Sequence, residues 1–468
     1  MRYAGERSVR INRGHWEEMR MRRMNGRRQV VLVLMLALIA PMSAALAGHA
    51  AAQDKPTIQM WFDTTGGAET AECMVKTAID PFNDRGGVQV KPRLQANNWD
   101  ATRTALAGGA GPDLIGTPGP SFAFELAKAG QLLPLDDMAK EMGWSESFLP
   151  WALNLGKVDG KLYSIPNEVE TLVLYYNKTL FEEKGWTPPK TLDELQTLSQ
   201  TIDDAGIIPF AHGNQEWRAA NEWFVGEFLN HAAGGPQQVY DALTGAAKWT
   251  DPSFVDSLTL LDTIQKSGWF MGGLERYYTT SFADANTQFA EGEAAMKIEG
   301  TWWIADSGLY FGEDAGNDSE WDWVPMPSAS GEAIFDLGIG STVSINAKSK
   351  NPVAVSEFMT DYFSPETQAK LTTECGLAPA PVNIPADRLS GLDARYASVL
   401  EALNTASAAN NYGYTTWTFW PPKSDVYIYE QIEKVWAGDM TVDQYLQGLQ
   451  TLFDQEKAAG DIPPIPER

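Results

Sequence analysis

The hydrophobic pattern of the chain alternates between the period of strands and the period of helices. Residues 57–62 (TIQMWF) are β-branched and aromatic and predict a strand, while residues 68–84 carry apolar positions at helical spacing. Two more strand–helix pairs follow, at 87–94 with 101–109 and at 112–117 with 121–130. Strands that alternate with helices are typical of an α/β domain with a largely parallel sheet.

Two longer extended runs interrupt this alternation. Residues 156–177 begin with a hairpin-type turn, VDGK, and continue into a long apolar run that contains Pro166. Residues 335–347 (FDLGIGSTVSINA) form a second such run. An extended segment between two α/β halves predicts a hinge. The remaining predicted helices lie at 188–206, 216–231, 251–267, 282–290, 352–363, 390–406, 425–436 and 441–457.

The stretch TQFAEGEAAMKIEGTWWI, residues 287–304, places two adjacent tryptophans directly after a predicted strand. Phe282, Ala285 and Phe289 before it have the spacing of a core-facing helical surface. The segment after a strand is usually polar, so Trp302 and Trp303 indicate either core residues or an aromatic binding surface.

The first 52 residues differ from the rest of the chain. Arg27 and Arg28 precede an apolar run at 30–40, and small residues follow up to Ala52, as in a secretory signal peptide. The apolar run is shorter than the roughly 20 residues of a membrane-spanning helix, which argues against an anchor. Met24 is an alternative start, and the Arg pair leaves twin-arginine export open.

Charge narrows the choice of partner. The first 52 residues hold nine Arg and three Glu, so 27 of the 36 basic residues and 58 of the 61 acidic ones fall in the rest. Such an acidic chain repels nucleic acid and anionic membrane. The remaining length is too large for one hydrophobic core and predicts two domains.

The sequence offers little catalytic or metal-binding chemistry. After residue 52 only His212 and His231 remain, without metal-ligand spacing to a cysteine, and no nucleophile or nucleotide motif occurs, so no cofactor or metal is expected. The acidic loop at 312–323 does not match the spacing of a calcium loop and is interpreted as solvated. Cys73 and Cys375 predict one disulfide in an exported chain, with two separate buried thiols as the alternative.

Four segments in order resemble a known family. They are LYSIPNEVETLVLYYNKTLFEEKGWTPPKTLDEL, FAEGEAAMKIEGTWW, FDLGIGSTVSINAKSKNPVAVSEFM and WPPKSDVYIYEQIEKVW. Together they resemble extracellular solute-binding protein family 1, the maltose-binding-protein-like carbohydrate-binding subunits of bacterial ABC importers.

The resemblance implies a two-lobed periplasmic-binding-protein fold. Each lobe would hold a mixed, mostly parallel sheet flanked by helices, and two or three crossing segments would form the hinge. The implied division is a signal peptide at 1–52, lobe 1 at 53–168 and 337–386, and lobe 2 at 169–336 and 387–468.

The resemblance also implies a set of ligand-binding residues in the cleft. Trp302 matches the family's stacking tryptophan, and Glu170 its crossover carboxylate, with Glu168 as a rival because two extra residues shift the count. Trp417 is a rival for the late-helix aromatic position. The full implied set is Gly67, Ala68, Glu69, Pro118, Gly119, Glu170, Glu216, Trp217, Trp302, Trp303, Gly338, Ser341, Trp420 and Tyr427. Pro118 and Gly119 stand where maltose-binding protein has other contacts, which places maltose itself in doubt.

The resulting hypothesis is an exported, monomeric, non-catalytic protein that captures a di- or oligosaccharide and delivers it to the permease of an ABC importer. Aromatic rings stack on sugar faces while carboxylates and amides accept hydroxyl protons. An anion such as glycerol phosphate is one alternative, but only Arg218 and Lys423 lie near the implied site, so an uncharged sugar is favoured. A secreted glycosidase and a sugar sensor are the others.

Overall fold

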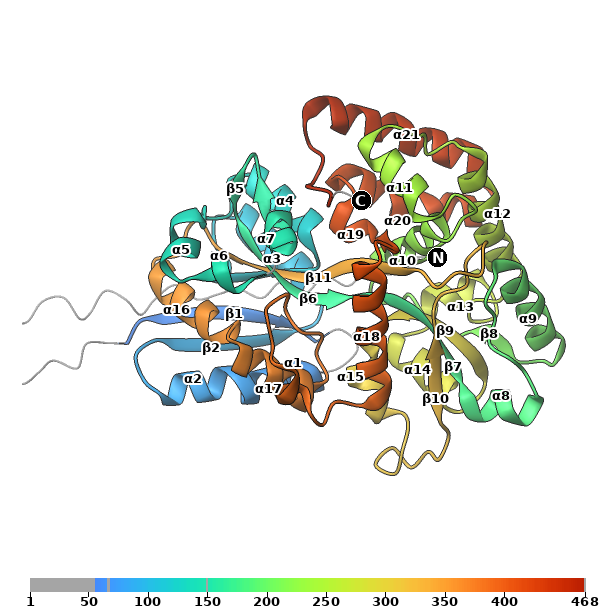
Figure 1. The fold of residues 1–468 in the computed structure, drawn as a ribbon, viewed down its shortest axis with the longest axis horizontal. Coiled ribbons are helices and arrows are strands. Elements are labelled where there is room, and N and C mark those ends of the chain that lie inside the picture. Colours follow the sequence, from blue (N-terminus) through green and yellow to red (C-terminus); the bar gives the residue numbers. More distant parts are fainter. Residues whose placement is uncertain (1–54, 65–67, 149, 467–468) are drawn as a thin grey trace, which may run out of the picture. The chain divides into compact units, whose positions relative to one another are not determined.

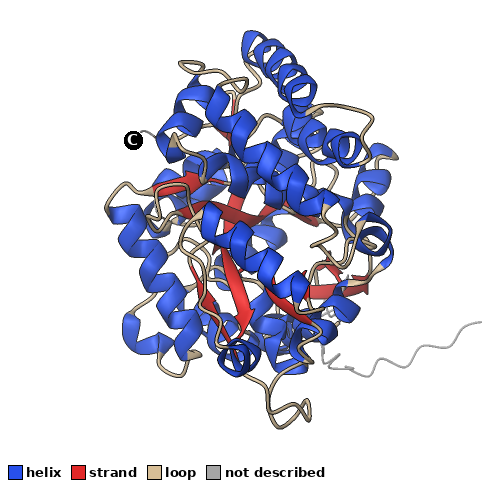
Figure 2. Cartoon of the chain, turned by 90° about the vertical axis from the view of Figure 1, so that its right-hand side faces the viewer, coloured by secondary structure: helices blue, strands red, loops and turns tan. Residues whose placement is uncertain are grey.

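The computed structural model describes residues 55–64, 68–148 and 150–466. The predicted signal peptide and Gly67 of the predicted site lie outside the described residues. Residues 54–468 form one compact unit, drawn in Figures 1 and 2. Two sheets organise this unit, and a two-stranded hairpin of β4 (Lys157–Val158) and β5 (Lys161–Leu162) forms at the predicted VDGK turn.

The first sheet has the strand order β12-β11-β3-β1-β2, and β6 also pairs with β11. Its strands are β1 (Thr57–Asp63), β2 (Gln89–Gln95), β3 (Leu114–Thr117), β6 (Ser164–Glu170), β11 (Phe335–Ile345) and β12 (Tyr412–Tyr414). The β1–β2, β1–β3 and β11–β12 pairings are parallel, whereas β11 runs antiparallel to β3 and β6. The expectation of a mostly parallel sheet therefore holds here.

The second sheet has the order β10-β7-β9-β8. Its strands are β7 (Leu172–Asn177), β8 (Ile208–Phe210), β9 (Ala294–Gly300) and β10 (Trp321–Val324). Only β8–β9 is parallel, since β7 runs antiparallel to both β9 and β10. The fold class is the expected mixed α/β one, but this sheet is not mostly parallel.

One of the passages of the chain between the two sheets consists of a single residue. β6 ends at Glu170 and β7 begins at Leu172, so only Thr171 separates a strand of the first sheet from a strand of the second. β6 pairs with β11 over Ser164–Glu170, so these two strands run together to the passage (Figure 1). The lobe boundaries inferred from the sequence remain a prediction, but both extended runs form the long strands that were expected.

Helices fill the intervals between strands. They are α1 (Glu69–Met74), the π-helical Val75–Ile79, α2 (Asp80–Asp84), α3 (Asn98–Ala107), α4 (Pro120–Lys128), α5 (Asp136–Glu141), α6 (Trp144–Ser147), α7 (Pro150–Leu155), α8 (Lys178–Lys184), α9 (Leu192–Asp204), α10 (Asn221–Asn230), α11 (Gly235–Thr244), α12 (Pro252–Lys266), α13 (Leu274–Thr279), α14 (Phe282–Ala290), α15 (Trp303–Asp306), α16 (Pro352–Tyr362), α17 (Pro365–Cys375), α18 (Ala394–Ala408), α19 (Thr416–Phe419), α20 (Pro422–Trp436) and α21 (Val442–Ala459). Short 3₁₀ turns lie at Arg218–Ala220, Ser307–Leu309 and Ala386–Leu389. Thr191 and Glu194 form a capping box that begins α9, as the sequence PPKTLDEL indicates.

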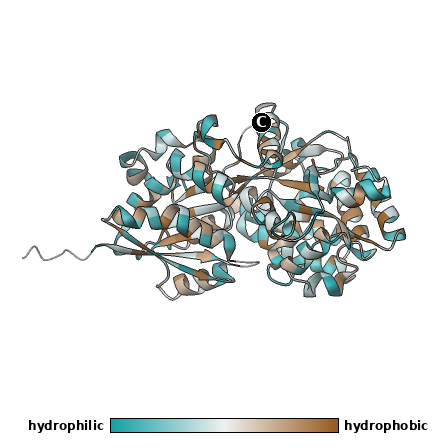
Figure 3. Cartoon of the chain, turned by 90° about the horizontal axis from the view of Figure 1, so that it is seen from below, coloured by the Kyte–Doolittle hydropathy of each residue, from teal (hydrophilic) through white to brown (hydrophobic). Residues whose placement is uncertain are grey.

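Apolar side chains form two buried clusters. Figure 3 colours the hydrophobic residues brown and shows them along the strands and at intervals along the helices. One cluster packs strands of the first sheet, such as Ile58 and Val90, against Val355 and Phe358 of α16. The larger cluster surrounds the second sheet and includes Leu174, Met296 and Phe224. Within the part of the chain that the structure describes, no helix is long and apolar enough to cross a bilayer.

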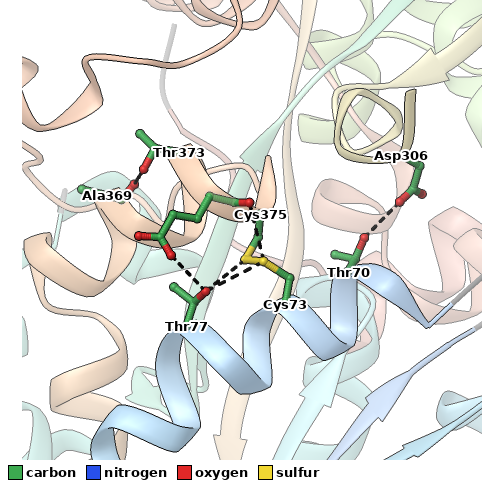
Figure 4. Close-up of a disulfide and its surroundings, with 8 residues drawn as sticks. Thr70, Cys73, Thr77, Asp306, Ala369, Thr373 and Cys375 are labelled. Carbon is green, nitrogen blue, oxygen red and sulfur yellow. Dashed lines mark hydrogen bonds between the residues drawn. A yellow bond between two sulfur atoms is a disulfide. The ribbon is translucent and has the colours of Figure 1, made fainter. Parts of the chain in front are cut away.

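The predicted disulfide is confirmed. Cys73 of α1 is bonded to Cys375, the last residue of α17, across a sequence separation of 302 residues (Figure 4). Nearby, the Thr70 hydroxyl donates a hydrogen bond of 3.0 Å to Asp306, which lies in α15 beyond the second sheet. The disulfide therefore fastens α1 to α17, next to the hydrogen bond that joins Thr70 of α1 to Asp306 of α15.

Candidate functional site

A cavity of about 440 Å³ opens where the two sheets meet. One part of its wall comes from β1, α1, α3 and β3, another from β6 and β11, and a third from segments around the second sheet. Ligand sites of this volume are usual for small molecules and commonly lie at such junctions.

The strands β6 and β11 each have a short segment that faces this cavity. β11 is buried along its length except at Gly340 and Ser341, which both line the cavity. On β6 the facing residue Glu168 has φ of 56°, a left-handed conformation that side chains other than glycine rarely adopt. Strained backbone of this kind gathers at functional sites, and here it coincides with the cavity wall.

Carboxyl groups and amides form the polar wall. The Ser341 hydroxyl donates to Glu168, and the Asn167 amide donates to Ser341 Oγ over 2.9 Å. The carboxyl of Glu170 lies directly over Gly340, where any side chain would overlap it. Burial, together with the charge of Glu168, raises the pKa of Glu170 well above its usual value. Burial also raises the pKa of Glu168, although the Ser341 hydrogen bond opposes it.

Tryptophans form the apolar wall. Those among the described lining residues are Trp61, Trp99, Trp217, Trp223 and Trp302. The ring of Trp302 lies 4.9 Å from that of Trp223, and Phe282 stacks on Trp223 at 6.5 Å. Aromatic faces beside carboxyl and amide oxygens can hold a molecule with apolar faces and polar edges.

A buried ion pair lies beneath Trp302. The Trp302 indole N–H donates to Glu299 over 2.9 Å, and Glu299 lies 3.0 Å from the ammonium of Lys297. Burial would raise the pKa of Glu299, but Lys297 and then His212 outweigh it and lower that pKa to about 2. Glu299 is therefore charged, and its fixed carboxylate orients the indole ring toward the cavity.

Two smaller cavities adjoin the site. One of about 140 Å³ shares Trp223, Phe282, Trp302 and Asp306 with the main cavity and also reaches Lys297. Another of about 290 Å³ lies along the disulfide and shares Thr70 and Asp306 with the main cavity. Burial raises the pKa of Asp306, and the hydrogen bond from Thr70 opposes that shift.

Several predicted residues come together at the main cavity, namely Pro118, Glu170, Trp217, Trp302 and Ser341, with the rival Glu168. Glu216 is not on the wall, but its carboxylate accepts a 3.1 Å hydrogen bond from the backbone of Phe282 and so positions a lining ring. Ala68 is the N-cap of α1, and Glu69 lines the cavity beside the disulfide.

Other predicted residues are not brought to the main cavity. Trp303 is 3% exposed, packs on Tyr175 at 4.6 Å and faces the small adjoining cavity, because neighbouring residues of a helical turn point in different directions. Trp420 is fully buried against Trp249 at 5.2 Å. The Tyr427 ring stacks on Tyr445 at 5.5 Å, and its hydroxyl donates to the Tyr445 carbonyl.

Gly119 and Gly338 have a packing role in the structure. Any side chain at either position would meet Trp417, and at Gly338 also Thr415. Trp417 itself is buried and contacts Trp302 at 6.1 Å, so the rival aromatic supports the site from behind. These glycines allow that ring to approach β11 and the start of α4.

The sequence analysis missed several wall residues, including Trp61, Trp99, Trp223, Phe282 and Asp306. Trp223 stands six residues after Trp217, which is in the implied ligand-binding set. Trp61 lies on β1 but was assigned only to the strand. No sequence pattern marks Trp99, because its place depends on how α3 packs beside β1.

One cluster could hold a metal ion elsewhere in the chain. Ligand atoms of Glu227, His231 and Asp336 lie within 4.8 Å of one another, and all three side chains are buried. Burial raises the pKa of Asp336 to about 8, with Glu227 and Asn230 opposing, and burial lowers that of His231 to about 4. The His231 Nδ1 atom contacts the Glu227 backbone carbonyl at 2.8 Å, so this ring nitrogen is already engaged.

Comparison with known proteins is consistent with this architecture. Residues 77–390 match the family described as bacterial extracellular solute-binding protein. The chain is 24% identical to an uncharacterised ABC transporter extracellular-binding protein of Pyrococcus horikoshii, over 71% of this chain and 70% of that protein. It is 27% identical to a diacetylchitobiose-binding protein of Streptomyces coelicolor, but only over 46% of each chain.

Solved structures show the same fold. A chitin oligosaccharide binding protein superposes with a TM-score of 0.71 at 21% identity, covering 86% of this chain and all of that chain. At this identity the likeness establishes the two-lobed fold alone.

Proposed function

Because the chain belongs to the bacterial extracellular solute-binding proteins, we propose that it is exported, captures a sugar of two or more units and delivers it to an ABC importer. The supporting observation is the 440 Å³ cavity, whose wall joins five tryptophans to the oxygens of Asn167, Glu168, Glu170 and Ser341. Relatives named as sugar-binding and working with ABC transporters support the same assignment.

Capture without chemistry is the proposed mechanism. The sugar would bind between the wall that contains Trp302 and the wall formed by β6 and β11. It would favour a closed arrangement, in which both walls contact the sugar, over an open arrangement, in which only one does. A ligand shifts such an equilibrium only by its difference in affinity for the two arrangements. Thr171, the single residue between β6 and β7, is the natural pivot.

An anion binder on the same fold is a weaker candidate. A phosphate site needs Arg or Lys at the ligand, and the described lining of the main cavity contains neither. A glycosidase would require two carboxyls acting across a glycosidic bond. The anion binder predicts that a phosphate compound binds instead of a sugar. The glycosidase predicts that the bound sugar is cleaved.

A thermal-shift screen of the purified protein against mono-, di- and oligosaccharides and glycerol phosphates tests the proposal. A ligand at 100 times its Kd adds about 2.7 kcal/mol to stability. Trp302→Ala should weaken binding of the active sugar at least about tenfold, whereas Trp186→Ala, which removes a ring packed on Phe181 outside the cavity lining, should not. A hydrolysed sugar, or a response to glycerol phosphates alone, would overturn the proposal.

A further inference from the structure

The main cavity has an unbalanced charge. Its described lining includes the carboxyls of Glu168, Glu170 and Asp306, and none of the lining residues is Lys, Arg or His. A sugar site needs acceptors, but acceptors can also be amides and carbonyls, which carry no charge. Three carboxyls with no Lys, Arg or His among the lining residues are therefore more than hydroxyl recognition requires.

Nearby cations are engaged elsewhere. Lys297, in the small adjoining cavity, lies 3.0 Å from Glu299 and donates to Asn286 over 2.7 Å. Arg218 pairs with Glu433 at 2.7 Å. Arg93 and Arg103 lie against the rings of Trp61 and Trp99, at 4.6 and 5.8 Å from the centroids, and neither is among the lining residues. None of these cations contacts Glu168 or Glu170.

The pair Glu168–Glu170 is the focus of the imbalance. Ser341 donates to Glu168, but within the described structure the Glu170 carboxyl accepts no hydrogen bond, although it is 5% exposed. The titratable groups that face the pair are the phenols of Tyr175, Tyr362 and Tyr396, from β7, α16 and α18. Phenols are neutral at physiological pH, so the pair has no compensating charge.

An ammonium group fits this environment better than a hydroxyl. It donates three hydrogen bonds and supplies the missing positive charge. Tryptophan faces also attract cations, most strongly where water is excluded. The buried carboxyl of Glu170 and the half-buried carboxyl of Glu168, beside an aromatic wall, thus provide both elements of a site for a protonated amine.

We propose that the captured sugar carries a basic nitrogen, whose ammonium binds between Glu168 and Glu170 against the aromatic wall. This inference rests on the proposed function and departs from the expectation of an uncharged sugar. Glu170 selects the amine, and Glu168, held by Ser341 in its left-handed conformation, completes the acceptor pair.

Matched pairs of sugars test the inference. Each pair has one skeleton of two or more units in a hydroxyl and an amino form, such as cellobiose, maltose or lactose and the amino counterpart of each. Calorimetry at pH 7 should show the amino form binding at least about tenfold tighter, which corresponds to 1.4 kcal/mol. That advantage should disappear in Glu170→Gln and shrink in Glu168→Gln, while exposed Glu183→Gln on α8 should retain it.

Proton release gives an independent readout. At pH 6 a sugar amine is protonated, so the ammonium displaces the proton that burial keeps on the carboxyl pair. Titrations in two buffers of different ionisation enthalpy should show up to one proton released by the amino form and none by the hydroxyl form. Affinity for the amino form should fall as pH decreases, because protons compete for the pair.

The outcomes separate the inference from the function on which it rests. If the hydroxyl forms bind as tightly as the amino forms, or if Glu170→Gln leaves the preference intact, the inference is wrong and the sugar-binding proposal stands. If neither form of any skeleton binds, both proposals fall. Glu168→Gln and Glu170→Gln should unfold at or above the parent's temperature, because a neutral amide replaces one of two carboxyls whose charges would otherwise repel each other.

Discussion

Trp302 connects two buried carboxyl clusters that differ in one respect. Its indole N–H binds Glu299, which lies 3.0 Å from Lys297, whereas its ring lines a cavity with Glu168 and Glu170, which have no cation beside them. The pKa of Glu299 is lowered to about 2, because Lys297 overcomes the effect of burial, and that of Glu170 is raised well above its usual value by burial and Glu168.

The difference shows what each cluster does. A carboxylate with its own cation is permanently charged and serves as a structural anchor, here for the ring of Trp302. A carboxyl pair without one keeps a proton until a partner arrives. The first cluster is complete within the chain, while we propose that a ligand completes the second.

Removing the lysine from the complete cluster should have the largest effect. Lys297→Met leaves Glu299 buried without its cation, and we expect stability to fall by about 3–5 kcal/mol in urea denaturation. The matched control is Lys178→Met, whose ammonium lies at the same 3.0 Å from Glu320 but at the surface, where a loss of about 0–1 kcal/mol is expected. Equal losses in both variants would contradict the anchoring role of Lys297.

A methyl group placed under the incomplete cluster should have an intermediate effect. Gly340→Ala overlaps the carboxyl of Glu170, and we expect a loss of about 1–3 kcal/mol together with weaker ligand binding. Gly308→Ala, whose added Cβ would meet nothing within 4 Å, should be nearly neutral. The double variant Gly340→Ala/Glu170→Ala should recover part of the stability loss; strict additivity would show that Glu170 is not the neighbour that clashes.

The pH dependence of stability should have opposite signs for Glu299 and for a third carboxyl cluster, formed by Asp336 and Glu227. This third cluster also lacks a cation. Burial raises the pKa of Asp336 to about 8, with Glu227 and Asn230 opposing, from an ordinary value of 3.8. The folded chain then binds a proton that the unfolded chain has lost, so this contribution is complete below pH 3.8 and is lost as pH rises to about 8.

We expect a slope of about 1 kcal/mol per pH unit within that window, measured by urea unfolding at pH 5, 6 and 7. Asp336→Asn should flatten it, because the amide cannot lose a proton. Glu299, with its lowered pKa, contributes the reverse: stability that is present above pH 4.5 and is lost as pH falls toward 2. An unchanged slope in Asp336→Asn would show that the Asp336–Glu227 pair does not hold this proton.

Much of the fold could be predicted from periodicity. The strand at TIQMWF, the helix capped by Thr191 and both extended runs form where their residue types predict them, because these signals are local. Elements with weaker patterns were missed, such as α17 and the short strands β10 and β12, whose existence depends on partners far along the chain.

The site residues also divide into those that a local sequence signal indicated and those that depend on the tertiary structure. Motif resemblance identified Glu170, Trp302 and Ser341, but adjacent residues such as Trp302 and Trp303 look equivalent in the sequence. The turn after β9 points one ring to the cavity and the other into the core. Trp99 and Asp306 reach the same wall from segments about 200 residues apart, which no local pattern can indicate.

The sequence by itself determined the alternation of strands and helices, the acidic charge and the pair of cysteines, because each depends on residue type and near neighbours. Only the tertiary structure decided which carboxyls have a cation. Lys297 and Glu299 lie on one strand with their charges together, while Glu168 and Glu170 meet β11 at a glycine and a serine. Charge balance inside a protein depends on distances across the fold, and those distances separate an anchor from a binding site.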